Sequence, residues 1–361
     1  MKNTFILVLL CITTIVRAHV AQDTLKPSPF AVSGYIEAYY LYDFNQPGSN
    51  TRPPFVYAYN RHNEVNINLG FIRGAYTTEN VRANLAIMTG TYANANLAAE
   101  PGVLKNIYEA NAGVRLSSTR NLWVDAGIFS SHIGFESAVG KDCWSLTRSI
   151  MAENSPYYEA GAKISYTTDN GKWFVSGLIL NGWQRIQRVD GNSLPSFGTQ
   201  VTFKPSDKVT LNSSSFVGTD KPDSARQMRY FHDFYGIFQV SKNVGITVGF
   251  DYGVEEKSPE TSSTNPWISP IILAKFTVSD KLALAVRGEY YHDAHGVIIA
   301  TGTPNGFKTA GVSANFDYQL NANALWRVEV RHFTSKDAIF EDDNDVSKNN
   351  TFVTTALAIS F

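Results

Sequence analysis

Residues 244–252 read VGITVGFDY, and this stretch decides the class of fold. Its bulky apolar residues occupy every second position, from Val244 to Tyr252. A period of two places successive side chains on opposite faces of a β-strand, whereas an α-helix repeats every 3.6 residues. The stretch therefore predicts a strand with one apolar face and one polar or small face.

The same alternation returns along most of the chain. It is clear in residues 64–71, 81–87, 282–290, 309–317 and 326–331. These runs are mostly about 9 to 12 residues long, the length of a tilted strand that crosses a bilayer. A soluble β-sandwich also alternates, so alternation alone does not distinguish a membrane protein from a soluble one.

The connections between the runs alternate between short and long. Short connections rich in turn-forming residues are predicted at 77–80, 117–121, 167–172, 205–207, 241–243, 279–280 and 319–323. Long connections are predicted at 46–60, 92–106, 132–156, 184–195, 219–228, 254–266, 293–306 and 335–349. This regularity is typical of an outer-membrane barrel with short periplasmic turns and long extracellular loops. The prediction is an all-β, membrane-spanning, antiparallel up-and-down barrel of about sixteen strands, closed so that no sheet edge meets lipid.

The first residues predict export. Lys2 precedes an apolar run at 5–16, and Val16, Arg17 and Ala18 form a small-residue cleavage site. We expect a signal peptide at 1–18, with residue 21 as the alternative end, then a short periplasmic segment at 19–29 and the barrel at 30–361. The near-zero net charge of −1 argues against nucleic acid as a partner.

Aromatic residues and the last strand fit a barrel. We expect interfacial aromatic girdles to include Tyr39, Tyr40, Tyr42, Tyr157, Tyr158, Trp173, Trp183, Tyr230, Phe231, Phe234, Trp267, Tyr290, Tyr291 and Tyr318. Residues 351–361 alternate and end at Phe361, like the terminal strands that the barrel-assembly machinery recognises in bacterial outer-membrane proteins. That machinery is therefore an expected partner.

Three stretches resemble a known family. They are 121–137 (NLWVDAGIFSSHIGFES), 155–173 (SPYYEAGAKISYTTDNGKW) and 180–187 (LNGWQRIQ), and they are similar to the putative β-barrel porin-2, OmpL-like porins. The resemblance runs through the whole mature chain. It implies an outer-membrane channel of a Gram-negative bacterium, identifies no solute, and brings no catalytic residues with it.

Charged residues on the polar faces are the candidates for the pore lining. They are Glu37, Glu64, Arg82, Glu109, Arg115, Asp125, Glu159, Lys163, Lys204, Asp251, Lys275, Arg287, Glu289, Asp317, Arg327, Glu329 and Arg331. Charges of both signs predict a water-filled lumen with weak ion selectivity. The alternative for any one of them is cross-strand pairing that stiffens the wall.

The longest connection, 132–156, is the candidate constriction. A loop this long either covers the mouth or folds into the lumen, and the sequence leaves both open. Its charged candidates are His132, Glu136, Lys141, Asp142, Arg148 and Glu153.

Other chemical signals are weak. His292, Asp293 and His295 lack a third metal ligand, and the acidic run at 341–345 lacks the glycine and terminal glutamate of a calcium loop. No glycine-flanked nucleophile precedes a helix. We expect no catalytic residue, no metal and no cofactor.

The predicted function is passive diffusion of small hydrophilic solutes or ions through an outer-membrane porin. A substrate-specific channel would have the same sequence features. A surface-binding or adhesive barrel and an outer-membrane hydrolase are the alternatives; the hydrolase would need a serine and a histidine close together on the outer wall. Expected partners are lipid, lipopolysaccharide and the solutes. The sequence leaves open whether the protein forms a homo-oligomer.

Overall fold

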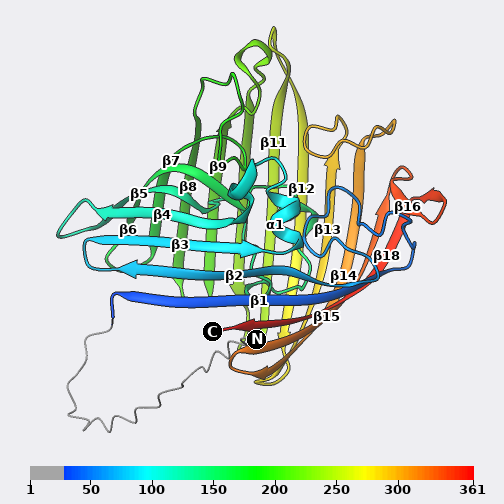
Figure 1. The fold of residues 1–361 in the computed structure, drawn as a ribbon, viewed down its shortest axis with the longest axis horizontal. Coiled ribbons are helices and arrows are strands. Elements are labelled where there is room, and N and C mark those ends of the chain that lie inside the picture. Colours follow the sequence, from blue (N-terminus) through cyan, green and yellow to red (C-terminus); the bar gives the residue numbers. More distant parts are fainter. Residues whose placement is uncertain (1–27) are drawn as a thin grey trace, which may run out of the picture.

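The computed structural model describes residues 28–361, and sixteen of its strands close into one antiparallel barrel (Figure 1). The first strand, β1 (Phe30–Asp43), pairs with the last, β18 (Asn349–Ser360), and so closes the cylinder. This confirms the prediction of an all-β barrel of about sixteen strands. Within 28–361, no helix combines the length and the apolar character needed to span a bilayer.

The remaining barrel strands follow one another around the wall. They are β2 (Val65–Thr77), β3 (Val81–Thr89), β4 (Ile107–Arg115), β5 (Asn121–Ser130), β6 (Tyr158–Thr167), β7 (Trp173–Leu180), β8 (Ser196–Ser206), β9 (Val209–Gly218), β10 (Arg229–Gln239), β11 (Val244–Ser258), β12 (Thr261–Thr277), β13 (Leu282–Asp293), β14 (Phe307–Asn321) and β15 (Ala324–Ser335). The connections hold the hairpin β16 (Phe340–Asp342) and β17 (Asp345–Ser347), the helices α1 (Thr91–Asn96) and α2 (Ile150–Glu153), and the 3-10 helices η1 (Gly102–Asn106), η2 (Gly140–Asp142) and η3 (Asp223–Ala225).

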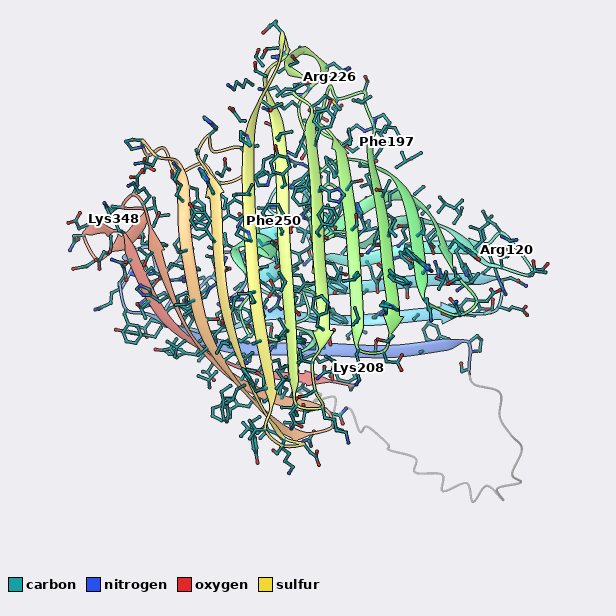
Figure 2. The ribbon with its side chains drawn as sticks, turned by 180° about the vertical axis from the view of Figure 1, so that it is seen from behind. Arg120, Phe197, Lys208, Arg226, Phe250 and Lys348 are labelled. Carbon is teal, nitrogen blue, oxygen red and sulfur yellow. The ribbon has the colours of Figure 1, made fainter. Side chains whose placement is uncertain are left out.

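Short and long connections lie at opposite ends of the barrel. Figure 2 shows Lys208, in a short turn, and Arg226, in a long connection, at the two ends of the same part of the wall. We call these the short-turn end and the long-loop end. All seven predicted short turns separate consecutive strands of the barrel.

One predicted long connection is wrong. Residues 254–266 were expected to form a loop, but β11 runs on to Ser258 and β12 starts at Thr261, so only 259–260 turn the chain. The hairpin was missed because its residues are polar on both faces, and such a strand gives no alternating signal.

The wall has an apolar outer face and a polar inner face. In β11, Val248 and Phe250 are 45% and 41% exposed, whereas Thr247, which precedes Val248, and Asp251, which follows Phe250, are 2% and 3% exposed. Figure 2 shows Phe250 on the outside of the wall. The outer face therefore has the side chains that a lipid environment requires.

β2 departs from its predicted register. Its apolar residues at 65–71 were expected on one face, but Val65 is 78% exposed and Leu69 is fully buried. The pairing with β1 shifts between Ile67 and Leu69, so a bulge at Asn68 turns the rest of the strand over.

The aromatic girdles were predicted only in part. Trp173, Tyr230, Phe234 and Tyr318 are exposed on the outer wall, as expected. Six of the predicted girdle residues are instead buried inside the barrel: Tyr39, Tyr157, Tyr158, Phe231, Trp267 and Tyr291. In pairs of adjacent residues such as Tyr230 and Phe231, the pleat sends one side chain outward and its neighbour inward.

Candidate functional site: a loop fixed inside the barrel

Residues 131–157, which we call the inner loop, fold into the barrel and contact its inner face. Three buried arginines on the wall hold them there, and we call Arg287, Arg327 and Arg331 the arginine clamp. Arg327 donates to the carbonyl oxygens of Gly140 at 2.6 Å and Cys143 at 3.0 Å. Arg287 donates to the carbonyl of Thr147 at 2.8 Å, and Arg331 donates to that of Arg148 at 2.7 Å.

Acidic residues on β13, β14 and β15 neutralise the clamp. Arg327 pairs with Asp317 at 2.6 Å, Arg287 pairs with Glu329 at 2.7 Å, and Arg331 pairs with Glu289. Two of these carboxylates also accept hydrogen bonds from the inner loop: Glu329 from the amide of Thr147 at 2.6 Å, and Glu289 from that of Ile150 at 2.7 Å.

The strand register explains this grouping. The alternation of β13 and β15 puts residues 287 and 289, and 327, 329 and 331, on the inner face, and β14 lies between the two strands. Buried charges are tolerated only when they are paired and hydrogen-bonded, and the five donors of a guanidinium can serve a carboxylate and backbone carbonyls together. The inner loop supplies those carbonyls.

Arg148 organises the inner loop from within. Its buried guanidinium donates to the carbonyls of Ser137, Ala138 and Leu146. Glu136 accepts a hydrogen bond from the amide of Ser149 at 3.0 Å. The loop is therefore a folded unit, attached to the wall at several points.

Glu153 joins the inner loop to a second loop that folds inward, residues 44–64. Its carboxylate accepts hydrogen bonds from the backbone amides of Tyr57 at 3.0 Å and Ala58 at 3.2 Å. Burial raises the pKa of Glu153 to about 7, against the lowering effect of those two amides. In the same second loop, Phe55 packs against Phe307 of the wall with ring centroids 4.7 Å apart.

The three other predicted constriction residues lie in two places, His132 in one and Lys141 and Asp142 in the other. His132 is buried, with Nδ1 at 2.9 Å from Glu159 and Nε2 at 2.8 Å from the carbonyl of Ser215. Lys141 donates to the hydroxyl of Ser360 at 2.8 Å. Asp142 lines a cavity at the short-turn end.

Cavities lie on both sides of the inner loop. The cavity at the long-loop end has a volume of about 320 Å³, and residues 153–155 of the inner loop form part of its wall. The cavity at the short-turn end has a volume of about 500 Å³ and is bounded by Val139, Lys141 and Asp142 of the same loop. The inner loop therefore stands between the two mouths of the barrel.

A second group of predicted lining residues comes together on β3–β6. Arg82 pairs with Asp125 at 2.6 Å, and Glu109 pairs with Arg73 at 2.7 Å. Arg82, Glu109, Asp125 and Lys163 share a cavity of about 380 Å³. Unlike the arginine clamp, Arg82 and Lys163 are only partly buried.

The other predicted lining residues are scattered. Glu37 is buried and accepts a hydrogen bond from the hydroxyl of Tyr59 at 2.8 Å. Gly140 packs against this site so closely that a Cβ atom added to it would collide with the carboxylate of Glu37. Lys275 is half-buried, whereas Lys204 is exposed near a short turn. At the rims, Arg115 pairs with Glu79 at 3.7 Å and Glu64 pairs with Arg61 at 2.9 Å.

Sequence reasoning missed two features of the interior. Asp251 lies directly opposite Asp233 on β10, and both are buried, but the pairing of two strands had to be known to bring them together. The inward fold of residues 44–64 did leave a signal, because FVYAY at 55–59 is an apolar run inside a connection.

One serine and one histidine do meet on the outer wall. Ser213 on β9 and His232 on β10 are half-buried, with Oγ and Nε2 3.0 Å apart. Within residues 28–361, no three His, Cys, Asp or Glu side chains are grouped so that they could hold a metal ion.

Comparisons with known proteins agree with this architecture. The chain is similar to the outer-membrane-expressed OmpT of Vibrio cholerae, with a TM-score of 0.59 and 10% identity over 93% of this chain and 99% of that chain. It is also similar to the anion-selective porin from Comamonas acidovorans, with a TM-score of 0.59 and 9% identity over 92% of this chain and 99% of that one. For the outer membrane channel DcaP of Acinetobacter baumannii the TM-score is 0.58, with 11% identity over 92% of this chain and 97% of that one.

At sequence identities of 9% to 11%, these structural similarities show a shared fold and nothing further. No curated protein matches the chain. The sequence matches the family described as "Putative beta-barrel porin-2, OmpL-like" over residues 29–361, which confirms the resemblance carried by 121–137, 155–173 and 180–187. The chain belongs to the putative beta-barrel porin-2, OmpL-like family, and its closed barrel is that of an outer-membrane channel.

Proposed function

We propose that this porin lets small hydrophilic solutes and ions diffuse passively across the outer membrane, and that the inner loop forms its constriction. The observation that carries the proposal is the position of the inner loop, which the arginine clamp fixes between a cavity of about 320 Å³ and one of about 500 Å³. A hydrogen-bonded loop across a lumen sets the width of the path that is left.

We propose weak ion selectivity. The clamp charges are paired with carboxylates, and the Arg82–Asp125 and Arg73–Glu109 pairs are balanced as well. Paired charges leave little net potential to attract one sign of ion. The chain as a whole is close to neutral, with 31 basic and 32 acidic residues.

The expected cellular context follows from the same family. The proposed signal peptide at 1–18 and most of the segment at 19–29 lie outside the described residues. With the short turns in the periplasm, the long-loop end faces outward and contacts lipopolysaccharide, and the exposed apolar wall contacts lipid. Phe361 at the end of the closing strand is the expected signal for the barrel-assembly machinery.

We also propose that the protein forms a homo-oligomer through β3–β6. Four alanines lie opposite one another on the outer face of these adjacent strands: Ala83, Ala112, Ala126 and Ala162. The wall elsewhere carries large side chains such as Trp173 and Phe234. A smooth face lets a second barrel approach closely, and one of the similar structures is a trimer form of Vibrio cholerae OmpT.

We propose no enzymatic role. The Ser213–His232 pair is the feature that a lipid hydrolase would use, but both strands around it are fully paired in the sheet. Their backbone amides are used in the ladder, so they cannot also stabilise an oxyanion. An adhesive role would rest on the long loops, and no contact in the structure favours it over a channel.

Deleting residues 140–150 tests the constriction. Removing the segment that the clamp holds should widen the path, so single-channel conductance in planar bilayers should rise about twofold or more. A control deletes 222–226 from an outer connection that does not touch the clamp. If the deletion of 140–150 left conductance equal to that of the control, the inner loop would not form the constriction.

A further inference from the structure

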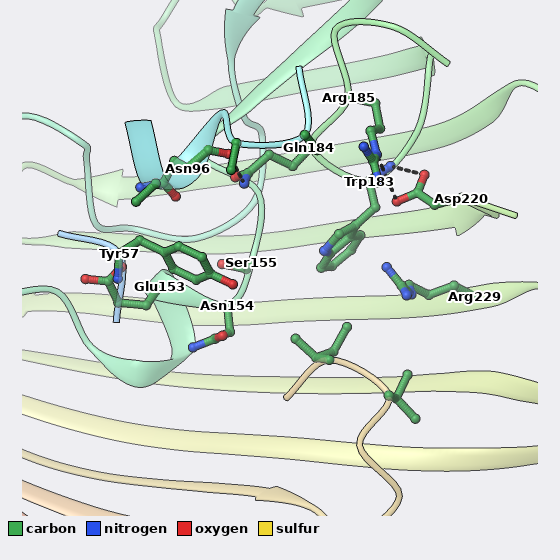
Figure 3. A pocket seen from close by; sticks show the side chains of 15 residues that line it. Tyr57, Asn96, Glu153, Asn154, Ser155, Trp183, Gln184, Arg185, Asp220 and Arg229 are labelled. Carbon is green, nitrogen blue, oxygen red and sulfur yellow. Dashed lines mark hydrogen bonds and ion pairs between the residues drawn. The ribbon is translucent and has the colours of Figure 1, made fainter. Parts of the chain in front are cut away.

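The cavity at the long-loop end has the features of a binding site. It lies between the inner loop and the connections 90–106, 181–195 and 219–228, and its volume is about 320 Å³. Figure 3 shows Tyr57 and Trp183 approaching it from opposite sides, with Asn96 and Gln184 along another edge. A solute entering from the long-loop end would meet this cavity before the inner loop.

Asn96 is the most informative residue of the cavity. It is 6% exposed, and neither its amide nitrogen nor its amide oxygen has a hydrogen-bond partner in the protein. Its position is fixed, because it ends α1 and its backbone carbonyl accepts from the side chain of Gln184 at 3.3 Å. Leaving a buried polar group unpaired costs about 1 to 3 kcal/mol. Both amide atoms are shielded from solvent, so a ligand that both donates and accepts would reach them after a small shift of the neighbouring side chains.

Trp183 supplies a rigid apolar surface beside this amide. Its ring packs edge-on against Phe216 at 5.0 Å and Phe231 at 4.9 Å between centroids. Its backbone amide donates to Asp220 at 3.0 Å. An aromatic ring held in this way binds a ligand without losing side-chain entropy.

The charged groups around the cavity are balanced. Two basic side chains, Arg185 and Arg229, and two acidic ones, Glu153 and Asp220, line it. Arg229 is already paired with Glu255 at 2.6 Å, and Arg185 lies 3.9 Å from Asp220. No unpaired arginine is left to hold a free carboxylate, and the carboxylate of Glu153 is already hydrogen-bonded to the amides of Tyr57 and Ala58.

We propose that this cavity binds a neutral polyhydroxylated solute, a mono- or disaccharide, on its way to the inner loop. The inference rests on the proposed channel function and specifies its substrate class. Each sugar hydroxyl can donate and accept, so two neighbouring hydroxyls match the one donor group and one acceptor of the Asn96 amide. The guanidinium carbon of Arg229 lies over one face of the Trp183 ring, 5.3 Å from its centroid. The C–H face of the sugar ring would pack on the opposite face of Trp183.

Titration with maltose and glucose tests the site directly. The purified full-length protein in lipid nanodiscs is titrated calorimetrically, with sodium glutamate and choline chloride as charged comparators. We expect saturable binding of a sugar, with a dissociation constant of about 1 mM, and no saturable binding of the charged solutes. Saturable binding of glutamate or choline in place of the sugars would overturn the proposed chemical class.

Asn96→Leu and Asn94→Leu form a matched pair of variants. Asn94 lies in the same helix, but it is exposed and does not line the cavity. We expect Asn96→Leu to weaken sugar binding by about tenfold or more while leaving the unfolding midpoint unchanged or raised, because it removes an unpaired buried amide. Asn94→Leu should bind as the parent does. Equal binding by both variants would contradict the assignment.

Trp183→Phe provides a second test that keeps an apolar ring in place. It should weaken sugar binding by several-fold, and unchanged binding would count against the stacking surface. Ion conductance of the same samples separates the two proposals. Normal single-channel current steps without sugar binding would refute the sugar site alone. Sugar binding without current steps would refute the channel and leave the sugar site supported.

Discussion

At the scale of single residues, charges predicted to line a hydrated pore divide into two groups. Arg327 and its neighbours in the clamp are buried under the inner loop, and their partners are carboxylates and backbone carbonyls. Arg82 and Lys163 remain partly exposed around a cavity. The sequence places both groups on the inner face but cannot tell them apart, because the difference depends on where a distant loop folds.

Arg327→Met should loosen the inner loop. The change leaves Asp317 buried beside an uncharged side chain and removes the donor to two loop carbonyls, and breaking such a pair costs about 3 to 5 kcal/mol. We expect a lower free energy of unfolding in urea and noisier channel currents. Arg120→Met, at an exposed short turn, is the control (Figure 2). Stability equal to that of the control would show that the clamp does not hold the loop.

At the scale of elements, strands and short turns could be predicted and the interior loops could not. A strand in a barrel wall repeats every two residues because one face meets lipid, and turns need residues that permit tight bends. The β11–β12 hairpin was not predicted because both its faces are polar. The β2 bulge was not predicted because nothing in the sequence around Asn68 indicates an irregular position. Loops such as 131–157 have no period, so their contacts depend on the three-dimensional structure.

The contact between α2 and residues 57–58 should weaken as the pH rises. The pKa of Glu153 rises on folding from an ordinary 4.5 to about 7, because burial disfavours its charged form. Its contribution to stability is therefore complete below 4.5 and is lost as the pH rises through about 7.

Hydrogen exchange of the Tyr57 and Ala58 amides measures this contact. Relative to Glu153→Gln at each pH, their protection in the parent should fall at least roughly tenfold between about pH 5 and about pH 8. A constant ratio between parent and variant would contradict the assignment to Glu153.

At the scale of the whole molecule, closure and the two-faced wall follow from the sequence, whereas the filling of the lumen does not. The alternation in β11 and in the last strand anticipates which residues lie on the outer face of the wall. The outer face is uneven, however, with the alanine row on one side and aromatics such as Phe250 on another. That asymmetry becomes visible only when strand register aligns residues from distant parts of the chain.

Ala112→Trp tests whether the alanine row on β3–β6 forms a contact between barrels. Ala112→Trp puts a bulky ring in its middle, so an oligomer should dissociate to monomers in native mass spectrometry, while the barrel itself stays folded. Val312→Trp, on the exposed outer face of β14, is the control and should leave the oligomer intact. An oligomer that survives Ala112→Trp would place the contact elsewhere.

The most direct measurement is the current through the refolded protein in a planar bilayer under a salt gradient. A weakly selective diffusion channel predicts discrete conductance steps and a reversal potential near zero, because the charges around the path are paired. Protein that shows a fully folded barrel by circular dichroism and inserts into the bilayer, yet gives no current steps, would contradict the proposed channel.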